Sequence, residues 1–138
     1  MKDIFDLLGR ILLSFLFFFE AYDYIAYERL NKEAMTIYGL TWNQDFFLYG
    51  AIFLLILGAI TLLLGYRMRL GAVLLLIYFV PLTYIVHDFW MEPYGSEAYR
   101  LQSILFMKNI AIMGGLLICA THISGRYRIR RVFATTRV

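Results

Sequence analysis

The sequence predicts an all-α fold, an integral membrane four-helix bundle with both termini in the cytoplasm. Hydrophobic residues make up 62% of the 138 residues and charged residues only 17%, a balance more apolar than that of ordinary soluble domains. The apolar residues gather in four stretches, 7–27, 46–64, 70–86 and 101–121. Each is close to the length of helix that crosses a bilayer. We therefore expect a single transmembrane domain over 1–138, ending in a basic tail over 122–138.

The first stretch, 7–27, begins like a secretory signal, because Lys2 and Arg10 precede the apolar run ILLSFLFFF. A signal peptide needs small residues at its cleavage site. Here Glu20 and Asp23 occupy that region. We interpret the stretch as an uncleaved first span, and we expect the polar segment 26–45 after it to pack over the outer mouth of the bundle.

The second and third stretches are joined by a turn too short to cross a membrane, so they are expected to form a helical hairpin. Gly58, Thr61 and Gly65 recur at helical spacing in the second stretch, and Gly71 begins the third. Small residues let membrane helices approach each other closely. Glycines 114 and 115 of the last stretch could admit a neighbour in the same way.

The charges predict the orientation, because an even number of spans leaves both termini on one side. That side carries nine basic residues and two acids: Lys2, Arg10, Arg67, Arg69, Arg126, Arg128, Arg130, Arg131 and Arg137 against Asp3 and Asp6. The other side carries four basic residues and eight acids. The excess of positive charge predicts that both termini are cytoplasmic. The positive charge of the tail 122–138 is thus explained by its role in topology or by contact with anionic lipid. No nucleic-acid partner is expected.

Five polar side chains are predicted to meet in the outer leaflet. At a rise of about 1.5 Å per residue, Glu20 and Lys108 each lie about five residues inside the outer ends of their spans, with His87 at the outer end of its own. Asp23 is one turn from Glu20 on the same face, and Asn109 adjoins Lys108. Because an isolated ion in a bilayer is costly, we expect Lys108 and Glu20 to pair across the bundle.

Two interpretations of this cluster stay open. It is a structural network that fixes the register of the helices, or it is a ligand-binding or proton-handling site, since ionisable groups inside membranes are often functional. His87 fits equally well as an interfacial side chain. His122 is expected at the opposite membrane face, so no paired-histidine metal site is predicted.

The single cysteine, Cys119, excludes an internal disulfide, a dithiol redox pair and a thiolate metal cage. The sequence also lacks the motifs of phosphate loops, nucleophile elbows and zinc hydrolases. Whether the chain catalyses a reaction therefore stays undecided by sequence.

The segment TYIVHDFWMEP, followed by ILFMKNIAIMGGLLI, resembles the DoxX family of small four-helix bacterial membrane proteins. The likeness extends over nearly the whole chain and includes Arg10 in the first span and the basic turn in LLGYRMRLGA. One segment departs from the family, because FFFEAYDYI stands where many members carry a glycine and a lysine. Family roles therefore do not extend to Glu20 and Asp23.

The resemblance implies a multi-pass protein of the bacterial inner membrane with a quinone-linked role, since the family's namesakes are small subunits of a thiosulfate:quinone oxidoreductase. It implies His87, Lys108 and Asn109 as contacts of a quinone or other lipophilic headgroup. Glu20 or Asp23, which have no family role, are candidate proton acceptors by their place in the cluster. Because the sequence shows no electron-donor site, a redox role would need a partner protein. The competing interpretation is a non-catalytic membrane anchor or assembly partner. Membrane lipid is expected around the chain, and a homo-oligomer stays open.

Overall fold

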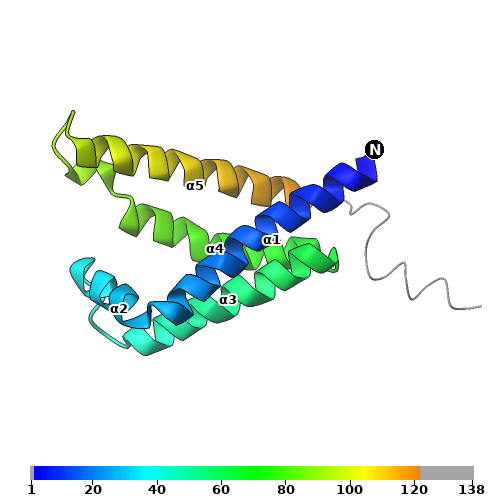
Figure 1. Cartoon of the computed structure of the whole chain (residues 1–138), viewed down its shortest axis with the longest axis horizontal. Helices are drawn as coiled ribbons and strands as arrows, with labels where there is room; N and C mark the ends of the chain where they lie inside the picture. Colours follow the sequence, from blue (N-terminus) through cyan, green and yellow to red (C-terminus); the bar gives the residue numbers. More distant parts are fainter. Residues whose placement is uncertain (1, 122–138) are drawn as a thin grey trace, which may run out of the picture.

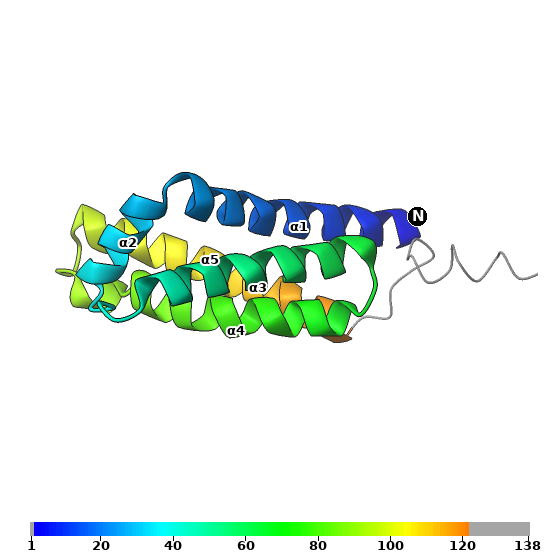
Figure 2. The same cartoon turned by 90° about the horizontal axis from the view of Figure 1, so that it is seen from below.

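A computed structural model describes residues 2–121, and all of its regular structure in that range is helical. The elements are α1 (Lys2–Ala26), α2 (Glu28–Ile37), α3 (Gln44–Leu64), α4 (Met68–Val86), the short 3-10 helix η1 (Phe89–Met91) and α5 (Glu97–Thr121). The four long helices run side by side along the molecule (Figure 2). The predicted all-α class is therefore confirmed for the described residues, whereas His122 and the basic tail 122–138 lie outside them.

The long helices pack in a row, with α1 against α3, α3 against α4, and α4 against α5. The first and last members of this row, α1 and α5, come together near the N-terminal end. There a Cβ built on Gly115 would lie 3.8 Å from the Leu13 side chain. Toward the end that carries α2 and η1 the two helices diverge (Figure 1). This divergence opens one side of the bundle.

The tightest packing lies between α3 and α4, as the small residues of these stretches predict. A Cβ on Gly58 would lie 2.7 Å from Leu75 Cδ2, and one on Gly71 would lie 3.0 Å from the Gly58 carbonyl oxygen. Thr61 directs its hydroxyl to that same carbonyl, 2.8 Å away. The close approach at Gly58 and Gly71 is therefore confirmed, whereas Gly114 faces open space.

Helix α2 forms within the polar segment 26–45, for which no helix was predicted. The helix is amphipathic, with Ala34 and Met35 turned to a pocket, and ion pairs one turn apart lie on its polar side: Arg29 with Glu33 at 3.2 Å, and Lys32 with Glu28 at 2.5 Å. Such pairs add to the stability of a short helix. The helix contacts both α1 and α3, and it covers the open end of the bundle (Figure 1).

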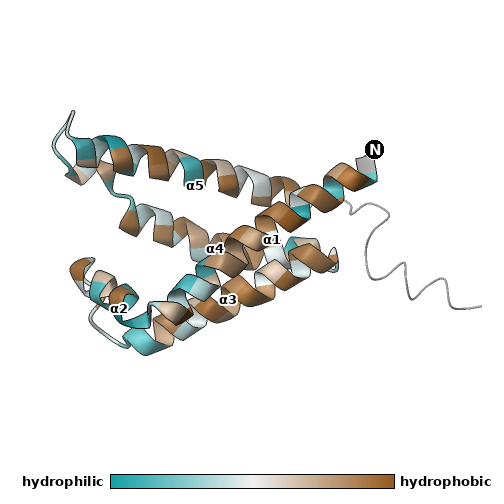
Figure 3. Cartoon of the chain, in the orientation of Figure 1, coloured by the Kyte–Doolittle hydropathy of each residue, from teal (hydrophilic) through white to brown (hydrophobic). Residues whose placement is uncertain are grey.

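Three described helical segments are long and apolar enough to cross a membrane: α3, α4 continued through η1, and α5. Figure 3 shows that hydrophilic residues gather at the end formed by α2 and η1. Helix α1 is not among the three, since it carries Arg10, Glu20 and Asp23 within its apolar sequence. The four-span count and the cytoplasmic placement of both termini thus stay predictions.

Arg10 shows how α1 accommodates its basic charge. Its side chain is 1% exposed. Its Nε lies 3.2 Å from Asp6 Oδ2 one turn earlier, and its Nη1 donates to the Leu63 carbonyl at 3.4 Å. Arg10 is therefore turned into the bundle, where the carboxylate and the end of α3 offset its charge.

Candidate functional site

A pocket of about 650 Å³ lies where α1 and α5 diverge. Its walls are mostly apolar, with α1 on one side, α4 and α5 on the other, and α2 with the following turn over it. The polar side chains that line it are Glu20, Asp23, Tyr24, Asn31, Tyr38, His87 and Asn109. Four of the five predicted site residues are therefore brought together here.

Glu20 and Tyr24, which line the pocket from α1, are linked by hydrogen bonds through Tyr78, which is not itself a lining residue. Tyr78 of α4 donates its hydroxyl to Glu20 Oε1 at 2.9 Å, and the Tyr24 and Tyr78 hydroxyl oxygens are 2.5 Å apart. Because Tyr78 gives its one proton to Glu20, Tyr24 is the donor in the second bond. Glu20 and Tyr24 are four residues apart on α1, so both reach the same neighbour. A pair of tyrosines thus adjoins the carboxylate, which sequence reasoning missed.

Asp23 lies one turn further along α1, beside the start of α2. The side-chain nitrogen of Asn31 lies 3.4 Å from Asp23 Oδ2 and 3.1 Å from the Tyr27 carbonyl. The amide therefore ties α2 to the end of α1. Asp23 remains partly exposed in the pocket.

The facing wall is formed by α4 and α5. His87 Nδ1 lies 2.8 Å from Gln102 Oε1. If this ring nitrogen carries the proton, Nε2 is an acceptor for a further group. Asn109 donates from its side-chain nitrogen to Thr83 Oγ1 at 3.1 Å, and Thr83 donates to the Phe79 carbonyl at 2.7 Å. An amide bonded in this way keeps a second N–H and its carbonyl oxygen for a ligand.

Lys108 lies apart from the other four predicted residues. Its side chain is exposed, and it lines a shallow hollow with Ser103, Ile104, Met107 and Ala111. The predicted ion pair with Glu20 is wrong: Glu20 accepts from Tyr78, and no ion pair of Lys108 occurs between residues 2 and 121. The reason is geometric, because α5 turns Asn109 inward, and the next residue on a helix points about 100° away.

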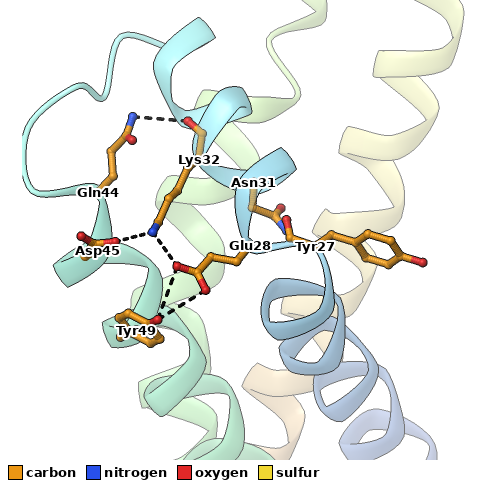
Figure 4. A network of polar contacts seen from close by, with 7 residues as sticks. All are labelled: Tyr27, Glu28, Asn31, Lys32, Gln44, Asp45 and Tyr49. Atoms are coloured by element: carbon orange, nitrogen blue, oxygen red, sulfur yellow. Dashed lines mark hydrogen bonds and ion pairs between the residues drawn. The ribbon is translucent and has the colours of Figure 1, made fainter.

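A network of polar contacts holds α2 against the start of α3 (Figure 4). Lys32 Nζ contacts Glu28 Oε1 at 2.5 Å and also contacts Asp45 Oδ1. The Tyr49 hydroxyl lies 3.4 Å from both Glu28 carboxylate oxygens, and Gln44 donates to the Lys32 carbonyl at 3.3 Å. Hydrogen bonds to Asp45 and Glu28 raise the pKa of Lys32 above its ordinary value. The cover of the pocket is therefore anchored by charge.

Within residues 2–121 no group of three or more His, Cys, Asp or Glu side chains is arranged to hold a metal ion. The polar side chains that line the pocket are hydrogen-bond donors and acceptors, and the other lining residues are mostly apolar. Such a lining suits an amphiphile, because polar groups orient one end of the ligand while apolar walls remove the other from water.

Comparison with curated proteins and with solved structures finds no match. The family model of DoxX matches residues 5–88. This match covers more than half of the chain, from α1 to the residue after His87, and it stops before α5. The chain therefore belongs to the DoxX family.

Proposed function

We propose that this DoxX protein binds a lipophilic ligand with a polar headgroup, a quinone, and acts as a membrane subunit or accessory factor of a redox system in the bacterial inner membrane. The observation that carries the proposal is the pocket of about 650 Å³, whose polar groups face one another across an apolar interior. This volume is typical of sites for small organic ligands. The pocket lies where α1 and α5 diverge (Figure 1), so a lipid-soluble ligand would enter between these two helices from the surrounding membrane.

The side chains of the pocket match the needs of a quinone headgroup. A quinone oxygen accepts hydrogen bonds, and the second N–H of Asn109 is a donor on one wall. His87, whose Nδ1 faces Gln102 Oε1, offers Nε2 as an acceptor for the hydroxyl of the quinol. Reduction to the quinol takes up two electrons and two protons. On the other wall the chain Glu20–Tyr78–Tyr24 is a hydrogen-bonded route for proton exchange.

The electrons would come from a partner protein. The chain has a single cysteine and so no dithiol pair. The protein would therefore act as a subunit or accessory factor of a redox system rather than as a self-sufficient enzyme. Of the structural network that is the alternative, the Lys108–Glu20 ion pair is not formed, whereas hydrogen bonds join Glu20 to Tyr78 and Asn109 to Thr83.

Lipid extraction tests the proposal. The protein is purified in mild detergent, and bound quinone is quantified by mass spectrometry for wild type, Glu20→Gln and Asn109→Leu. Lys108→Met is the matched control, because Lys108 lies outside the pocket. We expect stoichiometric quinone in wild type and in the control, and a loss of at least several-fold in the two pocket variants.

Melting temperatures of the same samples separate ligand loss from unfolding. A pocket variant that melts like wild type but carries no quinone supports the proposal. Wild-type protein that carries no quinone, or pocket variants that retain it in full, would overturn it.

A second candidate function is a non-catalytic anchor or assembly partner. The observation that favours it is Lys108, a charged side chain exposed on an apolar helix. The two functions are compatible, because the pocket and Lys108 use different faces of α5.

A further inference from the structure

Lys108 lies in the middle of a candidate membrane span and is exposed on the surface of this chain. The residues one turn away on either side are Ile104, Leu105, Ala111 and Ile112, none of which is charged. Helical neighbours at these spacings are the ones that could pair with it locally. The helix itself therefore supplies no counter-charge.

Between residues 2 and 121 no carboxylate forms an ion pair with Lys108. The nearest carboxylate on α5 is Glu97, which at a rise of ~1.5 Å per residue lies roughly 16 Å away along the helix axis. Glu20 is engaged by Tyr78 inside the pocket. Residues 46–87, which include nearly all of α3 and α4, contain no Asp or Glu, and neither does the tail 122–138. An ammonium group in hydrocarbon without a counter-charge is unfavourable.

The surroundings of Lys108 are shaped for a neighbouring helix. We define the Lys108 face as the residues of its hollow: Ser103, Ile104, Met107, Lys108 and Ala111. One turn further, a Cβ on Gly114 would meet open space. Small residues at Ser103, Ala111 and Gly114 allow a second backbone to approach closely. Met107 is 62% exposed, so this chain leaves the face largely uncovered.

We infer that the Lys108 face docks a transmembrane helix of another protein, and that this helix carries an Asp or Glu at the depth of Lys108. The inference rests on the proposed role as a membrane subunit, and it does not require the ligand pocket. We choose a helix with an acidic residue by charge complementarity, because a carboxylate would neutralise the ammonium charge of Lys108.

A second copy of this chain fits the Lys108 face poorly. A two-fold contact through this face would place Lys108 beside Lys108, and like charges in contact repel. The described helices also present no exposed carboxylate at a matching depth, since Glu20 and Asp23 line the pocket. A lipid phosphate reached by the extended lysine is the other alternative.

Site-specific crosslinking in native membranes tests the inference. A photoreactive residue replaces Ala111 on the Lys108 face, and the same residue at Phe53 is the control, since Phe53 is exposed on α3. We expect a protein adduct from position 111 and none from position 53. The adduct should fall at least fivefold with Lys108→Glu and persist with Lys108→Arg, which keeps the charge.

Charge reversal identifies the contact. The crosslinked helix is located by mass spectrometry, its Asp or Glu is changed to Lys, and the adduct with Lys108→Glu should return. An adduct twice the mass of this chain, a lipid adduct alone, or an adduct unchanged by Lys108→Glu would overturn the inference.

Bound quinone is measured on the same membranes. Loss of the adduct with Lys108→Glu at unchanged quinone content supports the docking face and leaves the ligand pocket intact. If the adduct forms but no quinone is found, the proposed ligand is overturned and the inferred docking face is still supported.

Discussion

Tyr78 of α4 donates a hydrogen bond to Glu20 of α1 at 2.9 Å, although α1 packs mainly against α3. The bond therefore joins α1 to α4 beside the pocket, where the rings of Phe17 and Phe79 also meet. It gives the carboxylate a donor inside a mostly apolar surrounding, where an unsatisfied charge would be costly. Tyr24 extends the contact by bonding to the same hydroxyl.

Removing the Tyr78 hydroxyl tests the importance of this bond. Tyr78→Phe is expected to lower the free energy of unfolding by about 1–3 kcal/mol, because a partly buried charged group loses its donor. Tyr84→Phe is the control, since Tyr84 is 59% exposed and packs mainly against Trp90 and Phe106. Denaturation in mild detergent measures the free energy of unfolding of both variants. Equal stability of the two variants would show that the bond contributes nothing.

The contact between α3 and α4 leaves no room for a methyl group at Gly71. Gly71→Ala places a Cβ against Thr61 Oγ1 and 3.0 Å from the Gly58 carbonyl, so we expect destabilisation of about 1–3 kcal/mol from overpacking. Gly114→Ala meets open space and should leave the melting temperature unchanged or slightly raised, since alanine favours helix. A Gly71 variant as stable as wild type would contradict the packing.

The two helical ion pairs Asp6–Arg10 and Arg29–Glu33 differ in burial. Both have N–O distances of 3.2 Å, but the first has side chains 1% and 9% exposed, whereas those of the second are 89% and 58% exposed. Asp6→Asn is expected to cost about 2–4 kcal/mol, because it leaves Arg10 buried with less compensation. Glu33→Gln should cost less than about 1 kcal/mol. Thermal melts compare the two, and similar losses would argue against the buried position of Arg10.

The attachment of α2 to α3 should resist alkaline pH. Because contacts with Asp45 and Glu28 raise the pKa of Lys32 in the folded protein, its contribution to stability is fully present below the ordinary lysine pKa. The contribution is lost only as the pH rises through the raised folded value. We expect the protection factors of residues 28–45, their hydrogen exchange relative to the intrinsic rate at each pH, to stay constant up to the ordinary lysine range and to fall above it.

Lys32→Met is the matched variant for this pH dependence. It should show faster exchange in 28–45 at neutral pH, with no further acceleration assignable to residue 32 at high pH. Protection factors of the wild type that already fall near neutral pH would contradict the anchoring role of Lys32.

Sequence alone determined the class of the fold and its closest helix contact. In a membrane, long apolar runs can pair the N–H and C=O groups of their backbone only as helices or as a closed barrel. The stretches 46–64, 70–86 and 101–121 therefore predicted α3, α4 and α5. The glycines at 58 and 71 predicted the close contact, because a missing side chain is visible in the sequence itself.

The tertiary structure decided which way each polar residue turns. Helix α5 is apolar on nearly every side, so its sequence has no periodicity that distinguishes Lys108 from Asn109, and packing against α4 through Asn109 and Leu116 fixes the rotation. Tyr78 was missed for a similar reason, since a tyrosine in an apolar run fits the lipid boundary equally well. A helix rotates about 100° with each residue, so only the neighbouring helices determine whether a charge lines the pocket or faces a partner.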